Sequence, residues 1–174
     1  MRRLRYNVAT SADGFIAGPN GEYDWITMDP TIDFAALLGE FDTLIMGRKT
    51  FETLRAQGPG GPMSGMNIVV VSTTLQSVDY PEVTIVSRDV PRAIAALKHK
   101  AGKDLWLFGG GKLFRTLLDA GLVDAVEVAV MPILLGQGIP MLPPGKASPP
   151  LKLERSRVTP SGIVMLTYGL KKSA

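Results

Sequence analysis

Short runs of consecutive apolar residues alternate along the chain with segments in which apolar residues recur at every third or fourth position. A run without polar alternation is typical of a strand that is buried on both faces. The runs lie within residues 42–46, 67–72, 83–87 and 104–108. The helical spacing is clearest at Val90, Ile94 and Leu97. Strands that alternate with helices predict an α/β fold with a largely parallel sheet.

The pattern changes in the last third of the chain. Val126, Val128 and Val130 stand at alternate positions, which is typical of a strand. Residues 151–158 and 164–170 flank a turn-forming segment and predict an antiparallel hairpin. We expect this hairpin to close one side of the sheet.

Two further elements are predicted near the N-terminus. Residues 4–10 predict the first strand, and residues 31–41 predict a short helix with an apolar face. Neither an internal repeat nor a linker-like stretch interrupts the sequence. We therefore expect residues 1–174 to form a single domain.

Three consecutive glycines join the apolar run at 104–108 to a helical pattern. Gly109 to Gly111 permit a tight turn and a close approach of a ligand to the backbone. The following helix, with Leu113 and Leu117 on one face, presents unpaired N–H groups that favour an anion such as phosphate. A purely structural turn explains the glycines equally well. The common dinucleotide motif does not fit, because Phe114 stands where it requires glycine.

A second glycine, Gly47, follows another buried run and precedes Arg48, Lys49 and Thr50. Two cations at the start of a helix oppose the helix dipole unless an anion is bound there. The Thr50 hydroxyl is a further donor. Gly47, Ser72 and the glycine triplet all fall at the C-terminal ends of predicted strands, where α/β sheets bind their ligands. These positions predict a phosphate-binding edge of the sheet.

Composition narrows the class of protein. Apolar residues make up 45% of the chain and charged residues 20%, as in ordinary globular proteins. No apolar stretch is long enough to span a membrane, and the N-terminus leads directly into a strand, so we expect a cytoplasmic protein without a membrane partner. The net charge of +3 is spread along the chain, which gives no support to nucleic-acid binding. Without cysteine, and with His99 as the single histidine, we expect no metal site.

Two acidic residues are candidates for proton transfer. Asp33 lies beside the apolar face of the helix predicted at 31–41, where it could be a half-buried proton donor or simply complement the helix dipole. Asp13 precedes a glycine and is either a second acid or part of a turn. The long loop at 11–25 carries Tyr23 and Trp25, so it either folds over a ligand or is a surface loop held by the tryptophan.

Taken together, these segments resemble the dihydrofolate reductase fold. They resemble more closely the reductase domain of the bifunctional riboflavin-biosynthesis deaminase/reductase and its stand-alone relatives. The resemblance implies a three-layer fold with a mixed, mostly parallel sheet flanked by helices and a C-terminal antiparallel hairpin. The motifs that carry it are Ser11-Ala12-Asp13-Gly14 with Ile16, Ile45-Met46-Gly47-Arg48-Lys49-Thr50, Gly109-Gly110-Gly111, and Gly121-Leu122-Val123-Asp124 followed by Pro132-Ile133-Leu134-Leu135-Gly136.

The resemblance implies that NADPH is the cofactor and assigns each matching position a part of it. The implied contacts are Ala9 and Ile16 at the nicotinamide, Gly47, Arg48, Lys49 and Thr50 at the pyrophosphate and ribose 2′-phosphate, Ser72 and Thr73 at the 2′-phosphate or adenine, Gly109, Gly110, Gly111, Lys112 and Leu113 at the pyrophosphate, and Phe114 near the nicotinamide.

The implied activity is hydride transfer from NADPH to a C=N or C=O bond of a small heterocyclic substrate, pterin- or aminopyrimidine-like, with Asp33 or Asp13 as the acid. Riboflavin-pathway reductases tend to carry a lysine where Asn7 stands and a glutamate near Gly109, so the resemblance does not define the substrate. The alternative is an NADP(H)-binding protein without turnover. The resemblance and the expected sheet edges also imply a homodimer.

Overall fold

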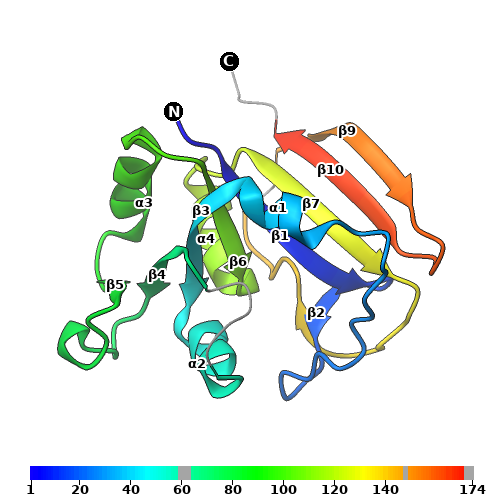
Figure 1. Ribbon diagram of the computed structural model, residues 1–174, viewed down its shortest axis with the longest axis horizontal. Helices are drawn as coiled ribbons and strands as arrows, with labels where there is room; N and C mark the ends of the chain where they lie inside the picture. Colours follow the sequence, from blue (N-terminus) through cyan, green and yellow to red (C-terminus); the bar gives the residue numbers. More distant parts are fainter. Residues whose placement is uncertain (59–63, 147–148, 171–174) are drawn as a thin grey trace.

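The computed structural model describes residues 1–58, 64–146 and 149–170. Its main feature is an eight-stranded sheet with the order β5-β4-β3-β6-β1-β7-β10-β9 (Figure 1). Neighbouring strands from β5 to β7 are parallel, whereas β10 runs antiparallel to both β7 and β9. The strands are β1 (Leu4–Ser11), β3 (Phe41–Gly47), β4 (Asn67–Val71), β5 (Val83–Val86), β6 (Asp104–Gly109), β7 (Ala125–Met131), β9 (Leu151–Val158) and β10 (Val164–Leu170).

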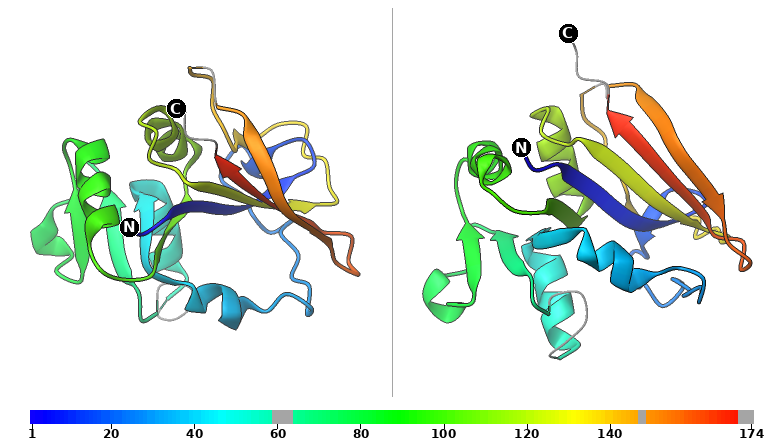
Figure 2. Two further views of the ribbon diagram at one scale, coloured as in Figure 1. Left: turned by 90° about the horizontal axis from the view of Figure 1, so that it is seen from above. Right: turned by 45° about the horizontal axis from the view of Figure 1, so that its top comes forward.

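Four helices cover the two faces of the sheet and give three layers. Helices α3 (Val90–His99) and α4 (Gly111–Asp119) pack on one face, and α1 (Phe34–Gly39) and α2 (Arg48–Ala56) lie on the other. In the right view of Figure 2, α3 and α4 lie above the sheet and α1 and α2 below it. A short 3-10 helix, η2 (Ser77–Asp79), connects β4 to β5.

The central strands are buried on both faces, as their unbroken apolar sequences predict. Leu44, Ile45 and Met46 of β3 are fully buried, and so are Leu105 and Leu107 of β6. Successive side chains of a strand point to opposite faces, so each strand contributes to two cores. One core contacts α3 and α4, and the other contacts α1 and α2.

Three details of the fold were not predicted from the sequence. The helix predicted at 31–41 is shorter, because Asp33 caps a helix that begins at Phe34 and ends at Gly39. Asp89 precedes α3 with a φ of 43° and makes no side-chain capping bond. A two-stranded sheet joins β2 (Phe15–Ala17) to β8 (Ile139–Pro140) within segments predicted to be loops. These strands are too short to produce a recognisable pattern.

The sheet is not covered evenly. On the face that carries α1 and α2, side chains from β1, β7, β9 and β10 line an open cleft. The helices that flank this cleft begin at the C-terminal ends of β3 and β6. The fold therefore brings the predicted ligand-binding edge and an uncovered part of the sheet into one continuous space.

Candidate active site

The cleft has a volume of about 1990 Å³ and extends from the first turns of α2 and α4 to the exposed faces of β7, β9 and β10. A volume of this size exceeds the usual range for small-molecule sites and leaves room for a cofactor beside a substrate. Its position at the C-terminal ends of parallel strands is where α/β sheets bind ligands.

The start of α2 forms one wall of the cleft. Gly47 is the N-cap residue and has no side chain to satisfy the helix amides, and no acidic residue stands in the first turn. Arg48, Lys49 and Thr50 all line the cleft with it. Both Arg48 and its ion-pair partner Glu52 (2.9 Å) are substantially exposed, so this pair is weak and the guanidinium is available to a ligand.

The glycine triplet forms the neighbouring wall. Gly110 has a φ of 91°, which favours glycine, and is the N-cap of α4 without a side-chain capping bond. A Cβ at Gly109 would lie 3.4 Å from Thr50 Cγ2, whereas a Cβ at Gly111 would lie 2.5 Å from the Pro140 carbonyl oxygen. The first turns of α2 and α4 thus meet at one place, and Gly109, Gly110, Gly111, Lys112 and Leu113 line the cleft there.

Ala9 and Ile16, the two residues expected at the nicotinamide, also line the cleft. Ala9 lies on β1, and Ile16 lies on β2. The small side chain of Ala9 leaves the surface of β1 open at this point. Both residues are therefore adjacent to the space that the cofactor walls enclose.

Three residues predicted to contact the cofactor do not line the cleft. The Ser72 hydroxyl accepts hydrogen bonds from the backbone amides of Thr74 and Leu75, both at 3.1 Å, so Ser72 stabilises a turn. Thr73 is exposed in that turn. Phe114 is buried in the core and stacks on Tyr6 with 3.8 Å between ring centroids. The structure thus places Phe114 in the hydrophobic core.

Neither candidate acid lines the cleft. Asp33 is the N-cap of α1, and its carboxylate accepts a hydrogen bond from the Ala36 amide (2.9 Å). Of the two roles considered for Asp33, its geometry is that of a residue at the helix N-terminus. Asp13 accepts hydrogen bonds from the Ser11 hydroxyl and from the amides of Gly136 and Leu135. The Ser11 bond and then the two amides lower the pKa of Asp13, which keeps it ionised at neutral pH. Both carboxylates hold the backbone in place.

The loop at 11–25 does reach the cleft, through its tyrosine. Tyr23 lines the cleft, and its hydroxyl accepts a hydrogen bond from Gln57 Nε2 at 2.8 Å. Trp25 is instead turned back on its own loop and donates from Nε1 to the Glu22 carbonyl (3.0 Å). This hydrogen bond between two exposed side chains attaches the loop to the end of α2.

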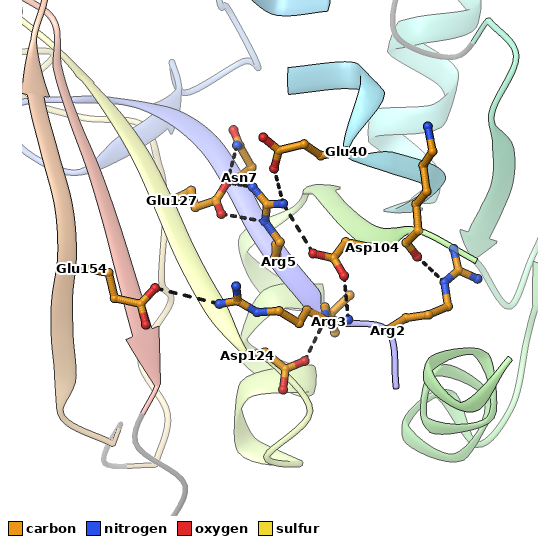
Figure 3. Close-up of polar contacts among 11 residues, drawn as sticks. Arg2, Arg3, Arg5, Asn7, Glu40, Asp104, Asp124, Glu127 and Glu154 are labelled. Carbon is orange, nitrogen blue, oxygen red and sulfur yellow. Dashed lines mark hydrogen bonds and ion pairs between the residues drawn. The ribbon is translucent and has the colours of Figure 1, made fainter. Parts of the chain in front are cut away.

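Sequence reasoning missed the polar floor of the cleft. Arg5 and Asn7 on β1 and Glu127 on β7 line it. Figure 3 shows Glu127, Glu40 and Asp104 around Arg5, with Asn7 bonded to Glu127. The alternation around Glu127 predicts a half-buried strand but does not distinguish a face in solvent from a face in a cleft. The Glu127 residue is in fact only 9% exposed.

Another buried carboxylate, Asp29, fixes the segment that leads into α1. It accepts hydrogen bonds from the Thr31 hydroxyl (2.6 Å) and amide (2.8 Å), and from the Ser161 amide (3.0 Å) in the turn between β9 and β10. The bonds from Ser161 and Thr31 lower the pKa of Asp29 well below its usual range. Asp29 therefore ties one rim of the cleft, at Thr27 and Met28, to the C-terminal hairpin.

We expect Asp29→Asn to destabilise the protein at pH 7 and to matter less in acid. Because the pKa of Asp29 is lowered on folding, its contribution is complete above the unfolded pKa of about 3.9 and is lost as the pH falls toward the folded value. Urea unfolding midpoints of both proteins at pH 7 and pH 3 measure this difference. A gap between the two proteins that is as large at pH 3 as at pH 7 would contradict the assignment.

A sequence model described as the RibD C-terminal domain matches residues 2–165 of the chain. The chain belongs to the RibD C-terminal domain family. It is similar to the uncharacterised protein YyaP of Bacillus subtilis (strain 168), with 33% identity over 179 residues that cover 97% of this chain and 95% of YyaP.

Solved structures support the RibD C-terminal domain assignment. A putative riboflavin biosynthesis protein from Shewanella sp. PV-4 has a TM-score of 0.84 and 28% identity, covering 99% of this chain and 100% of that one. Dihydrofolate reductase from Enterococcus faecalis, complexed with NADP(H), has a TM-score of 0.71 and 19% identity, covering 98% of this chain and 97% of that one. The similarity to dihydrofolate reductase is one of fold alone. The predicted family resemblance and three-layer α/β fold are confirmed.

The described residues contain neither a membrane-spanning helix nor a cluster of metal ligands. Across residues 1–58, 64–146 and 149–170, no helix is long and apolar enough to cross a bilayer. Within the same ranges, no group of three or more His, Cys, Asp or Glu side chains is arranged to hold a metal ion.

Proposed function

We propose that this RibD C-terminal domain protein is an NADPH-dependent reductase of a small heterocyclic substrate, pterin- or aminopyrimidine-like. The observation that carries the proposal is the meeting of two uncapped helix starts, at Gly47 and Gly110, in one cleft beside Arg48 and Lys49. Helix N-termini and cations together favour the phosphates of a dinucleotide. The cofactor-bound reductase of the same fold is consistent with it.

The residues present suit this cofactor. Arg48, Lys49 and Thr50 would hold the pyrophosphate and 2′-phosphate, and the amides at Gly110 and Gly111 would hold the pyrophosphate from the other wall. When bound, NADPH supplies the hydride to the C=N or C=O bond of the substrate. Ala9 and Ile16 would position the nicotinamide over β1, which leaves the floor beyond β1 for the substrate. Because Asp33 and Asp13 do not line the cleft, we propose water in the open cleft as the proton source.

Replacing Arg48 with alanine tests the cofactor assignment. We expect Arg48→Ala to weaken NADPH binding by about 10- to 100-fold, the usual loss for a charged hydrogen bond. NADH lacks the 2′-phosphate, so its weaker binding should change little. Fluorescence titration of the wild-type protein and of Arg48→Ala with NADPH and with NADH measures the four dissociation constants.

Arg92→Ala is the matched control. Arg92 is exposed on α3 and does not line the cleft, so its removal changes the net charge equally without touching the site. NADPH affinity should stay at the wild-type value. Equal losses for NADPH and NADH in Arg48→Ala would exclude a contact with the 2′-phosphate, and no saturable binding of either nucleotide would refute the reductase proposal.

The second candidate function is NADP(H) binding without turnover. It is favoured by one observation, namely that neither predicted acid lines the cleft. The two candidates differ in stopped-flow measurements of NADPH oxidation with pterins and aminopyrimidines. Tight NADPH binding without oxidation in the presence of any of these compounds would favour the second.

We include a homodimer in the proposal. Every residue of the edge strand β9 is exposed, among them Leu151, Leu153 and Val158 with exposed fractions of 46%, 52% and 68%. Exposed edge strands with apolar side chains pair readily with another strand. A second copy of the chain would cover this edge.

A further inference from the structure

Three polar residues form a row across the floor of the cleft. Asn7 on β1 pairs with Glu127 on β7, which pairs with Thr167 on β10. Residues in register on adjacent strands present their side chains on the same face, and all three line the cleft. Adjacent strands lie about 4.8 Å apart, so the row leads away from the glycine walls at β3 and β6. If the proposed function holds, with the cofactor at the glycine walls, the row lies at the end of the cleft that binds the substrate.

Glu127 is held in a fixed orientation at the centre of this row. Its carboxylate accepts hydrogen bonds from Arg5 Nε (2.6 Å), Arg5 Nη2 (3.0 Å) and Asn7 Nδ2 (2.7 Å). Arg5 is fixed in turn by Glu40 and Asp104 (Figure 3). Burial lowers the pKa of Arg5, but the hydrogen bonds that Arg5 donates to Glu127 and Glu40 outweigh it and raise this pKa, so the guanidinium stays charged.

This arrangement leaves acceptors facing the cleft. A carboxylate only accepts hydrogen bonds, so the Asn7 amide must turn its nitrogen toward Glu127, which leaves Oδ1 for another donor. In the part of the chain that the structure describes, no protein group donates to Asn7 Oδ1 or to the Thr167 hydroxyl. The floor therefore presents Oδ1, the one remaining lone-pair site of Glu127 and one hydroxyl.

Charged groups of both signs surround the floor. The carboxylates of Glu40, Asp104 and Glu127 surround a single guanidinium, that of Arg5. Arg3 also lines the cleft, but its guanidinium lies near Glu154 (4.0 Å) and is about half exposed. Around Arg5 the carboxylates outnumber the cation, whereas Arg155, in register with Thr167 on β9, and Arg157 add positive charge at the outer end of the row. The acceptors at Glu127 therefore suit the N–H groups of a ligand, and the outer end suits an anionic substituent.

Apolar side chains flank the polar row, from the helix α1 and from β6, the strand next to β1. Phe34 and Leu37 of α1 line the cleft, as do Trp106 and Phe108 of β6. Glu40, the C-cap of α1, bonds to Arg5 of β1, so this helix lies on the same side of the sheet as the polar row. An apolar wall beside a row of acceptors suits a flat ring whose edge carries N–H groups.

We infer that Glu127, with Asn7 and Thr167, is the specificity-determining group of this cleft and binds the N–H donor edge of the heterocyclic substrate. Arg5 is a positioning residue that keeps Glu127 oriented. This role belongs to a strand residue of the sheet and replaces the one expected for Asp33. It deepens the proposed function, because it states which side chains select the substrate.

The test compares two probes in the protein without nucleotide, by isothermal titration calorimetry. The probes are 2,4-diaminopyrimidine, whose amino groups donate, and unsubstituted pyrimidine, which has no donor. Wild-type protein should bind the diamino compound more tightly. Glu127→Gln should weaken that binding by about 10- to 100-fold and leave the weak binding of pyrimidine unchanged, so that selectivity between the probes is lost.

Asp104→Asn is the matched control, because it removes another carboxylate from Arg5 without changing a group that lines the cleft. It should keep the selectivity of the wild type. Thr167→Val, which is isosteric, should weaken binding of the diamino compound by several-fold. This variant provides the test if Glu127→Gln does not fold. Equal probe affinities in wild-type protein, or undiminished selectivity in Glu127→Gln and Thr167→Val, would overturn the inference. NADPH titration of the same variants tests the proposed function separately, since Glu127 is placed away from the cofactor walls.

Discussion

Asp124→Ala is expected to destabilise the protein by about 3 to 5 kcal/mol, because it leaves a buried ammonium group without its counter-charge. Lys98 is only 4% exposed, and its Nζ donates to the Asp124 carboxylate and to the Leu122 carbonyl (2.6 Å). The same carboxylate accepts from the Leu4 amide at the start of β1 (2.8 Å). Thermal unfolding should show a midpoint lowered by roughly 10 °C for a chain of this size.

Two further variants make this prediction specific. Glu154→Ala breaks an exposed ion pair with Arg3 and should cost less than about 1 kcal/mol. The double variant Lys98→Met with Asp124→Ala removes both charges, so it should recover much of the loss. If Asp124→Ala were no more destabilised than Glu154→Ala, the buried pair would be unimportant for stability.

Gly111→Ala is expected to destabilise the protein by about 1 to 3 kcal/mol and to abolish NADPH binding. A Cβ at Gly111 would lie 2.5 Å from the Pro140 carbonyl oxygen and 3.0 Å from that of Met141. Both contacts are with backbone, so the turn must move. Helix propensity alone predicts the opposite sign, because alanine is favoured over glycine in a helix by about 1 kcal/mol.

Gly39→Ala is the control, since Gly39 is also helical and a Cβ there meets no atom within 4 Å. It should be neutral or slightly stabilising and should leave NADPH binding unchanged. Urea unfolding and NADPH titration of both alanine variants measure the two effects. A stabilised Gly111→Ala that still binds NADPH would show that the close packing at this turn is unimportant.

The sequence was sufficient for the fold wherever burial determines the pattern. Strands β3 and β6 are buried on both faces, and their unbroken apolar runs predicted them. The starts of α2 and α4 were predicted from Gly47 and Gly110 with their neighbours, because a change of hydrophobic period marks both positions. The pairing of β2 with β8 was not predicted, since two to three residues carry no period.

The site was only partly predictable, because the direction in which a side chain points depends on the tertiary structure. The cations at the start of α2 were recognisable because they oppose the helix dipole. The position of Asp33 depended on where α1 begins, and a start at Phe34 makes its carboxylate a cap. The spacing of Glu127 is that of any half-buried strand, so its role emerges only when Asn7 and Thr167 are placed beside it.

The position of β1 also constrains how the chain can fold. The first strand lies between β6 and β7, with Leu4 opposite Leu105 and Arg5 opposite Ala125. During synthesis β1 therefore has neither partner until β6, which begins at Asp104, has been made. Such long-range pairing slows folding, so the early chain is the stage at which this protein is most exposed to aggregation.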